Sequence, residues 1–556
     1  MQKLPKLFIY ILAIIFVINL VQSHFTQLIY DEAYYWYYSQ NMAWGFFDHP
    51  PMVALLIKIS SYFFNGELGV RFMSCILSVG TLLLLWLQID NLKKKDYVLH
   101  FFVLTCSMTL LTAYGFLTLP DTPLLFFTAL FLYAYKKFTI EPSVPLALGL
   151  GLIMSALMYS KYHAVLVIVF VLLSNLKLLT NKLAWLAVTV SLIGYAPHLL
   201  WLYDNDFVSI KYHLFERPNR AYDLNDFTIG YFVNLLAIFG LPFFWIYKAL
   251  IKTHGKDLYT KALLFLTYGT LIFFFISSFN RRIQTQWIIV ISISLAIIAF
   301  NYMLENENAR KWIFRLGLVN IAILTIARFA LVFEEISPLH YESHGNKEWV
   351  QNLHEKAGDT PVIFENSYRK TPMYQFYSGV RSFSLNNVWY RRNQYSIDDS
   401  ESYMQHKEVF YVNKYDSKNQ AFQFLIGGTE INYAQHINDF ESFRKLQCIL
   451  EEDEIKKGTN ETILLKVYNP YTTDIALRKL KFNIAYHNQY KRPKEIVPIT
   501  VQQKNTENKV LKTNDTTYFS FKLPKYKMEN PGYFKVAISE NGLYPGMNGD
   551  NIKLVD

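Results

Sequence analysis

Long apolar runs separated by short polar turns recur along residues 1–335. An apolar run of about twenty residues crosses a bilayer as a helix, so this pattern predicts about eleven membrane-spanning helices. The first run has no small-residue cleavage site after it, which favours an uncleaved first helix over a signal peptide. The expected spans are Leu7–Val21, Leu68–Ile89, Tyr97–Phe116, Pro123–Tyr135, Val144–Tyr159, His163–Leu176, Leu183–Trp201, Ile229–Ala249, Ala262–Phe279, Trp287–Met303 and Ile313–Phe333.

The pattern differs between and after these spans. Pro51–Phe64 is apolar but short and begins with two prolines, so we expect a helix that lies along the outer membrane interface. After about residue 335 the chain reads as soluble, and residues 336–455 mix strand and helix patterns typical of an α/β domain. In residues 456–556, short runs of alternating apolar and polar residues are separated by turns, which predicts an antiparallel β-sandwich.

Charge fixes the expected orientation of the spans. If the N-terminus is cytoplasmic, the predicted cytoplasmic segments contain many Lys and Arg residues. They are Lys3, Lys6, Lys93–Lys95, Lys136, Lys137, Lys182, Lys252, Lys256, Arg310 and Lys311. This agrees with the enrichment of Lys and Arg in cytoplasmic loops. The same path places the C-terminal domains outside the cytoplasm.

Composition excludes several other classes of protein. The chain is 52% hydrophobic and 17% aromatic, as expected of a protein rich in membrane interfaces. Its net charge of +10 comes largely from the loops between spans, so it does not indicate nucleic-acid binding. The three cysteines are too scattered to predict a disulfide framework or a cysteine-based zinc site.

The strongest candidate for chemistry lies just after the first span, in DEAYYWYYSQNMAWGFFDHPP. Asp31 and Glu32 open this segment, and Asp48 and His49 close it before two prolines. Charged groups at membrane depth are costly and usually face a water-filled cavity in which they function. The aromatic residues between the two pairs suit the headgroup layer, so the segment predicts a reaction site at the membrane surface.

Further charged residues fall on the same predicted outer side. Asp121 lies in the turn TLPDTP, where a plain turn or helix-capping role is the alternative. Several outer cations oppose the usual topological bias and predict a site for an anionic ligand such as a phosphate, although each could instead contact lipid headgroups. They are Lys161, Arg217, Arg220, Arg281 and Arg282.

Common nucleotide-binding and hydrolase motifs are absent from the sequence, which contains no Walker loop, GxGxxG, GxSxG or HExxH. Outer carboxylates and cations without a nucleotide site favour a lipid-phosphate substrate. Asp31, Glu32, Asp48 and His49 offer ligand atoms for a divalent metal, but their spacing fixes no metal geometry. The sequence therefore leaves open whether a divalent metal takes part.

With these motifs the chain resembles the GT-C superfamily of membrane glycosyltransferases. It is most similar to the bacterial group of glycosyltransferase family 39, which includes relatives of protein O-mannosyltransferases and of the lipid A aminoarabinose transferase. The similarity covers roughly residues 1–335, and aminoarabinose transferases have Lys where this chain has His49. The matching elements are DEAYYW from Asp31, FDHPP from Phe47, LPDTPLLFF from Leu119, SKYHAVL from Ser160 and RRIQTQW from Arg281.

The resemblance implies transfer of a sugar from a polyprenyl phosphate to a protein, lipid or glycan hydroxyl, outside the bacterial inner membrane. It places the catalytic base at Asp31. The expected binding residues for donor and acceptor are Glu32, Asp48, His49, Asp121, Lys161, Arg217, Arg220, Arg281 and Arg282. A phosphate leaves as an anion without a general acid, so one carboxylate suffices and the expected reaction inverts the anomeric carbon.

Three other functions fit parts of the pattern. A flippase or transporter for lipid-linked sugars would place polar residues and broken helices at mid-membrane, whereas these charges lie at one surface. An O-antigen-type ligase or polymerase would use similar chemistry with different loops. A membrane anchor for active C-terminal domains would need far fewer spans.

Overall fold

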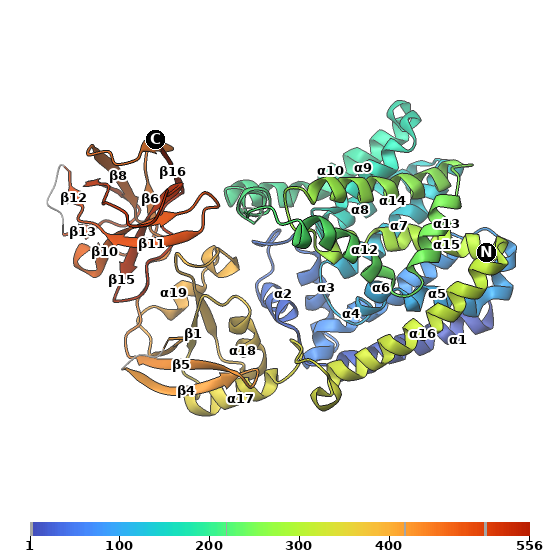
Figure 1. Ribbon diagram of the computed structural model, residues 1–556, viewed down its shortest axis with the longest axis horizontal. Coiled ribbons are helices and arrows are strands. Elements are labelled where there is room, and N and C mark those ends of the chain that lie inside the picture. The colour runs from blue at the N-terminus through green and yellow to red at the C-terminus, as the bar shows by residue number, and fades with distance from the viewer. Residues whose placement is uncertain (1–3, 218–219, 416–418, 505–508) are drawn as a thin grey trace. The chain divides into compact units, whose positions relative to one another are not determined.

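The computed structural model describes residues 4–217, 220–415, 419–504 and 509–556, which divide into two compact units. The helical unit comprises residues 1–213 and 222–346, and the sheet unit comprises residues 214–221 and 347–556 (Figure 1). Each unit has its own hydrophobic core. The separate outer domains predicted for 336–455 and 456–556 are both represented in the sheet unit, while their boundary at residue 455 stays a prediction.

The helical unit is built from α-helices of very different length. Two further segments are π-helical: Asn225–Ile229, and Tyr212–Glu216, of which residues 214–216 belong to the sheet unit. The α-helices are α1 (Lys6–Phe25), α2 (Tyr30–Gln40), α3 (Met52–Ser61), α4 (Gly66–Leu87), α5 (Val98–Ser107), α6 (Thr109–Ala113), α7 (Asp121–Ile140), α8 (Val144–Ser160), α9 (Ala164–Leu173), α10 (Lys182–Asp204), α11 (Val208–Lys211), α12 (Gly230–Phe239), α13 (Phe243–Lys252), α14 (Leu258–Ser277), α15 (Ile291–Glu305) and α16 (Glu307–Val332).

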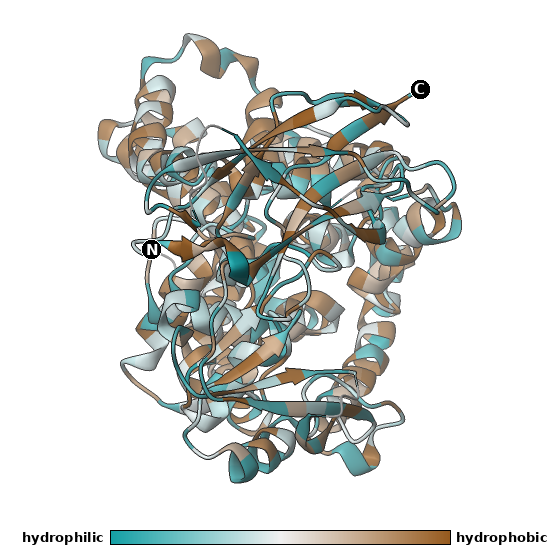
Figure 2. Cartoon of the chain, turned by 90° about the vertical axis from the view of Figure 1, so that its left-hand side faces the viewer, coloured by the Kyte–Doolittle hydropathy of each residue, from teal (hydrophilic) through white to brown (hydrophobic). Residues whose placement is uncertain are grey.

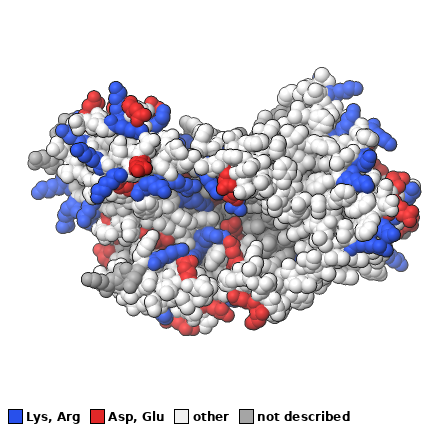
Figure 3. All heavy atoms as spheres, in the orientation of Figure 1, with Lys and Arg blue, Asp and Glu red and all other residues white. Residues whose placement is uncertain are grey.

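Five of these helices, α1, α4, α10, α14 and α16, are long and apolar enough to cross a membrane. The helices α3, α8, α9 and α15 are apolar but shorter. The chain is thus a polytopic helical membrane protein, as predicted, whereas the count of about eleven spans stays a prediction. On the visible face, charged side chains of the helical unit gather at its ends and leave a broad uncharged surface between them (Figure 3).

Two predicted spans are broken in the structure. Tyr97–Phe116 divides into α5 and α6 at Met108, where the Asn320 amide donates to the buried Ser107 carbonyl over 2.6 Å. Ile229–Ala249 bends by 97° between α12 and α13, at Gly240 with a φ of 62°. A side chain that replaces a lost helix hydrogen bond lets a helix end inside an apolar environment.

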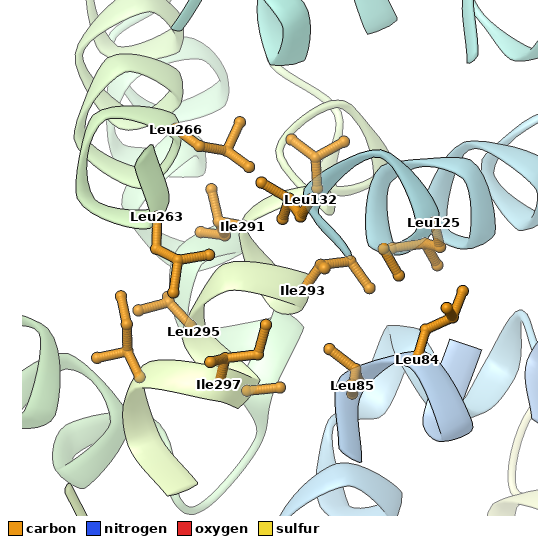
Figure 4. Close-up of a cluster of buried hydrophobic side chains, with 14 of the residues drawn as sticks. Leu84, Leu85, Leu125, Leu132, Leu263, Leu266, Ile291, Ile293, Leu295 and Ile297 are labelled. Carbon is orange, nitrogen blue, oxygen red and sulfur yellow. The ribbon is translucent and has the colours of Figure 1, made fainter. Parts of the chain in front are cut away.

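Helix α15 lies at the centre of the helical unit and is buried on all sides from Ile291 to Phe300. Figure 4 shows its isoleucine and leucine side chains meeting those of Leu84 on α4, Leu132 on α7 and Leu263 on α14. A helix that is hydrophobic all round packs inside a protein instead of facing solvent or lipid. The other long helices therefore present their remaining faces to the bilayer.

The sheet unit combines one mixed sheet with two sheets of a β-sandwich. Three helices accompany them: α17 (Asn346–Ala357), α18 (Lys370–Ser378) and α19 (Ser400–Met404). The strands are β1 (Val362–Glu365), β2 (Ser382–Leu385), β3 (Val409–Asn413), β4 (Gln420–Ile426), β5 (Glu430–Ile437), β6 (Gln447–Ile449), β7 (Glu454–Lys456), β8 (Thr462–Tyr468), β9 (Ile475–Ala476), β10 (Leu480–His487), β11 (Pro493–Pro498), β12 (Gln502–Gln503), β13 (Val510–Leu511), β14 (Thr516–Lys522), β15 (Tyr533–Glu540) and β16 (Ile552–Val555).

The mixed sheet has the order β2-β1-β3-β5-β4, parallel in its first three strands and antiparallel in the others. The sandwich pairs a β11-β10-β15-β16-β7 sheet with a β12-β14-β8-β6 sheet. Brown and teal residues both occur along its strands (Figure 2), and buried side chains alternate with less buried ones along β8 because alternate side chains enter the core. The predicted C-terminal strands are confirmed. Strands β6 and β7 also join the sandwich, although they precede or span residue 455.

A buried carboxyl in the sandwich makes the stability of the protein depend on pH. The pKa of Glu540 is raised to about 7, because burial and the nearby Glu401 raise it more than Arg444 lowers it. The Arg444 Nε lies 3.1 Å from a Glu540 carboxylate oxygen. Since the folded state holds this proton more tightly than the unfolded state, the contribution of Glu540 to stability is largest below about pH 4.5 and falls as pH rises towards 7.

We expect Glu540→Gln to remove this dependence. The glutamine variant should gain up to about 3 kcal/mol relative to the native protein between pH 4.5 and 8, since each pKa unit is worth about 1.36 kcal/mol. Thermal unfolding of the full-length protein at several pH values measures the difference. Asp474→Asn is the control, because Asp474 is exposed. A constant difference between native and Glu540→Gln proteins at all pH values would contradict the expectation.

Candidate active site

Helix α2 places the acidic pair in its first turn, where the helix dipole favours negative charge. Glu32 is fully buried, and its carboxylate forms an ion pair with the equally buried Arg71 of α4. One Glu32 oxygen also accepts a hydrogen bond from the Thr118 N–H at 2.8 Å, and the other accepts from the Ile29 N–H at 3.2 Å. Glu32 thus ties α2, α4 and the turn before α7 together.

Arg71 completes this junction. Its guanidinium donates to the backbone carbonyls of Ser23 and Gln27, each over 3.1 Å, at the end of α1. A buried ion pair is stabilising only when further hydrogen bonds satisfy its remaining donors and acceptors. That condition holds here, so the pair acts as a structural lock. The predicted binding role of Glu32 stays a prediction.

Asp31 lies beside this lock and is half-buried. It interacts electrostatically with Tyr114, which follows α6, and with Tyr341, which follows α16. Tyr114 interacts in the same way with Asp121. The fold therefore brings Asp31 and Asp121, which are far apart in the sequence, to the same tyrosine.

Asp121 and Lys161 form a second buried pair. The Lys161 ammonium donates to an Asp121 oxygen over 2.7 Å, and only 6% and 4% of the two side chains are exposed. Asp121 begins α7, and Lys161 follows α8 in an extended conformation. Since an ammonium has three N–H donors, Lys161 keeps donors beyond the one given to Asp121.

Asp48 and His49 lie in the loop between α2 and α3. The hydroxyl of Tyr38 donates to the Asp48 carboxylate over 3.3 Å, and burial raises the pKa of Tyr38 well above its usual value, so this hydroxyl stays protonated. The His213 Nε2 lies 2.7 Å from the Asp48 carbonyl oxygen and donates to it. The His49 and His213 rings lie 5.9 Å apart, and Tyr162 interacts electrostatically with Asp48.

The predicted outer arginines divide into three groups. Arg281 donates to the His213 carbonyl at 3.5 Å, which links it to the Asp48 loop. Arg282 pairs with Asp226 over 3.1 Å and is 61% exposed. Arg217 and Arg220 belong to the 214–221 segment of the sheet unit, so their place in the phosphate site stays a prediction.

Comparisons with known proteins find similarity to glycosyltransferases. Residues 48–201 match the model for dolichyl-phosphate-mannose-protein mannosyltransferases. The chain is 27% identical over 201 residues to the lipid A galacturonosyltransferase RgtD of Rhizobium johnstonii, a match that covers 34% of this chain. It therefore spans only 41% of that relative's length.

Two crystal structures of ArnT from Cupriavidus metallidurans are also similar to this chain. The apo structure matches with a TM-score of 0.55 at 12% identity, and the structure bound to undecaprenyl phosphate with a TM-score of 0.54 at 13% identity. Each match covers 77% of this chain and 97% of ArnT. The chain therefore shares the fold of ArnT. Its five long apolar helices agree with a protein that spans a membrane.

The candidate site contains residues that the sequence motifs did not reveal. Arg71 lies inside an apolar span, where a charged residue is itself a signal of function or of a buried pair. His213 connects Asp48 to Arg281, and Tyr114 connects Asp31 to Asp121. These connections come from residues in separate helices, so no local motif contains them.

A divalent metal cofactor stays a prediction. Among the described residues, the group of histidines and acids spaced for a metal is Glu334, His340 and His344. In His344, Nδ1 accepts the Tyr341 N–H and Nε2 donates to the Ala330 carbonyl, so neither nitrogen is available to a metal in this conformation. The donor set therefore does not fit a metal in this conformation.

Proposed function

We propose that this protein transfers a sugar from a polyprenyl phosphate to a hydroxyl acceptor on the outer face of the membrane, with Asp31 as the general base. The proposal is carried by the different surroundings of the two residues of the acidic pair. Arg71 and two backbone N–H groups engage Glu32, whereas half-buried Asp31 shares Tyr114 with the Asp121–Lys161 pair. The undecaprenyl phosphate bound to ArnT supports the donor class.

The chemistry follows from the charges of the reactants. Asp31 accepts the proton of the acceptor hydroxyl as its oxygen forms a bond to the anomeric carbon. The bond from that carbon to the phosphate oxygen breaks at the same time, and the lipid phosphate leaves as an anion. Lys161, His49 and Arg281 are the residues proposed to offset the charge that grows on the phosphate. A single displacement of this kind inverts the anomeric carbon.

The proposal is tested with purified protein and a panel of polyprenyl-phosphate sugars. The expected result is release of polyprenyl phosphate that depends on Asp31, together with a glycan that disappears from the envelope of a deletion strain. Mass spectrometry measures both. Movement of an unmodified lipid-linked sugar across vesicles without bond cleavage would instead support the flippase alternative.

A second prediction concerns the donor-phosphate site. We expect Lys161→Met to raise the apparent KM for the donor about ten- to a hundredfold, since a hydrogen bond to a charged group is worth about 1.5–3 kcal/mol. The acceptor KM should change little. Steady-state kinetics with each substrate varied in turn makes the comparison.

Two variants support this measurement. Lys211→Met is the matched control, because Lys211 pairs with Asp206 at the surface and is 53% exposed. Lys161→Met/Asp121→Asn removes the buried acid that the single change leaves unpaired, and it tests the site if the single variant unfolds. A donor KM that stays at its native value in both variants would mean that Lys161 only stabilises the fold.

A third prediction concerns topology. We propose that the N-terminus is cytoplasmic, that the membrane is crossed an odd number of times and that the sheet unit lies in the periplasm, where it positions the acceptor. Lys and Arg gather at the end of the helical unit that carries the N-terminus in Figure 1, as expected of a cytoplasmic side (Figure 3). A periplasm-dependent reporter fused after Asp556 should be active, and a cytoplasm-dependent reporter should not. The opposite pattern would reverse the assignment.

A further inference from the structure

A cavity of about 660 Å³ lies within the helical unit. It is formed by α1, α4, α5, α6, the start of α7 and α16, and most of its lining is aliphatic or aromatic. Binding cavities for small molecules typically have volumes of about 300–1,000 Å³ and combine an apolar lining with a few polar groups. The size and lining of this cavity therefore suit a lipid chain with a polar group.

Arg328 on α16 supplies a positive charge to this cavity. Its Nη2 donates to the Asn19 side-chain oxygen over 2.9 Å and to the Thr112 carbonyl over 3.2 Å. Its Nη1 is buried and has no hydrogen-bond partner among the described residues. The guanidinium also stacks over the Phe116 ring, with its central carbon 4.6 Å from the ring centre.

The charge of Arg328 is not balanced by the walls of the cavity. No carboxylate is found among the described residues that line it, and both Nη2 partners are neutral. An uncompensated charge at membrane depth is costly, so such residues usually face a water-filled path or bind an opposite charge. Nη1 is itself enclosed, so an anionic ligand would turn the side chain to take up this donor and offset the cost.

The mouth of the cavity faces the bilayer between α1 and α16. The lining residues Val17, Val21 and Phe25 on α1 and Phe329 and Phe333 on α16 are each at least half exposed. Exposed apolar side chains on membrane-spanning helices contact lipid tails. A lipid can therefore enter sideways from the membrane without leaving an apolar environment.

The inner end of the cavity reaches the candidate active site. Tyr114 and Thr122 both line it. Tyr114 interacts electrostatically with Asp31 and Asp121, and Thr122 follows Asp121 in the first turn of α7. Successive helix residues point about 100° apart, so Asp121 can face Lys161 while Thr122 faces the cavity.

We propose that this cavity binds a lipid-anchored acceptor that enters between α1 and α16, with Arg328 holding a phosphate or carboxylate group of that lipid. The inference rests on the proposed function. The donor phosphate is assigned to Lys161, which lies against Asp121, whereas Thr122 faces the cavity. A second site for an anionic lipid therefore serves the other substrate, the acceptor. Asp31, close to the inner end, then meets the acceptor hydroxyl.

Lipid binding tests the cavity without any sugar transfer. Delipidated full-length protein is mixed with dioleoyl phosphatidic acid or with dioleoylglycerol, which has the same chains and no phosphate, and the retained lipid is measured by native mass spectrometry. The native protein should retain phosphatidic acid about tenfold better than dioleoylglycerol. Arg328→Gln should abolish that preference, and Arg328→Lys should keep most of it.

Matched variants separate the cavity from the general membrane surface. Arg315→Gln is the charge control, because Arg315 is an exposed residue of the same helix that does not line the cavity. Val21→Trp narrows the mouth and should weaken retention of both lipids, whereas Ile326→Trp, which is 67% exposed and outside the cavity, should not. Equal losses in Arg315→Gln and Arg328→Gln would overturn the site.

Kinetics then test whether the bound lipid is the acceptor. Dioleoyl phosphatidic acid should inhibit sugar transfer but leave hydrolysis of the donor by water unchanged, and Arg328→Gln should be insensitive to it. Equal inhibition of transfer and hydrolysis would assign the cavity to the donor and overturn the inference. If the protein binds phosphatidic acid through Arg328 but cleaves no polyprenyl-phosphate sugar, the proposed function fails and the anionic-lipid site stands alone.

Discussion

Asp31→Asn should lower the rate of sugar transfer by about a hundredfold or more, because a general base typically contributes about 10²–10⁴-fold to catalysis. Asparagine keeps the size of the side chain but cannot accept the proton of the acceptor hydroxyl. Asp31 is half-buried and lies outside the Glu32–Arg71 lock, so the variant should insert and fold like the native protein. Transfer is measured as release of polyprenyl phosphate under single-turnover conditions.

The matched control for this variant is Asp206→Asn. Asp206 also lies on the predicted outer side, but its side chain is 87% exposed and pairs with Lys211. It should retain native transfer activity. Donor binding should survive in Asp31→Asn, because the proposed phosphate site does not include Asp31. A well-folded Asp31→Asn protein with near-native transfer would exclude Asp31 as the base.

Arg71→Met should destabilise the helical unit by about 3–5 kcal/mol, the usual cost of removing one partner from a buried ion pair. The change leaves the Glu32 carboxylate buried without its counter-charge and removes hydrogen bonds to the carbonyls of Ser23 and Gln27. Thermal unfolding in detergent, or the yield of correctly inserted protein, measures the effect.

Two further variants are compared with Arg71→Met. Arg71→Met/Glu32→Gln should recover part of the loss, because the neutral amide no longer carries a buried charge. Arg282→Met breaks an ion pair whose arginine is 61% exposed, so it should cost at most about 1 kcal/mol. Similar losses for Arg71→Met and Arg282→Met would mean that burial does not set the strength of the Glu32 pair.

Periodicity predicted the class of fold because membrane spans and sandwich strands each have a strong local signal. The breaks within two of the spans were harder to predict from the sequence. The bend at Gly240 coincides with Gly240-Leu241-Pro242, a recognisable helix breaker, yet the run around it is apolar enough to resemble one span. The break at Met108 has no local signal, because Asn320, far along the chain, supplies the replacement hydrogen bond.

The candidate site shows the same limit. Motifs identified Asp31, Asp121 and Lys161, but neighbouring Asp31 and Glu32 are indistinguishable until Arg71 is placed beside Glu32. The pairing of Asp121 with Lys161 likewise depends on how α7 and α8 pack. Spacing along the chain names candidate residues, whereas tertiary packing decides which of them pair.

The burial of α15 constrains how the protein is made. Its neighbours α4, α7 and α14 are synthesised before it, but α16, which also packs against it, follows it in the chain. A nascent chain that ends before Glu307 therefore holds a central helix with one side still uncovered. Assembly of the bundle should finish only when α16 has left the ribosome, so chains interrupted there are expected to remain open and become substrates for membrane proteases.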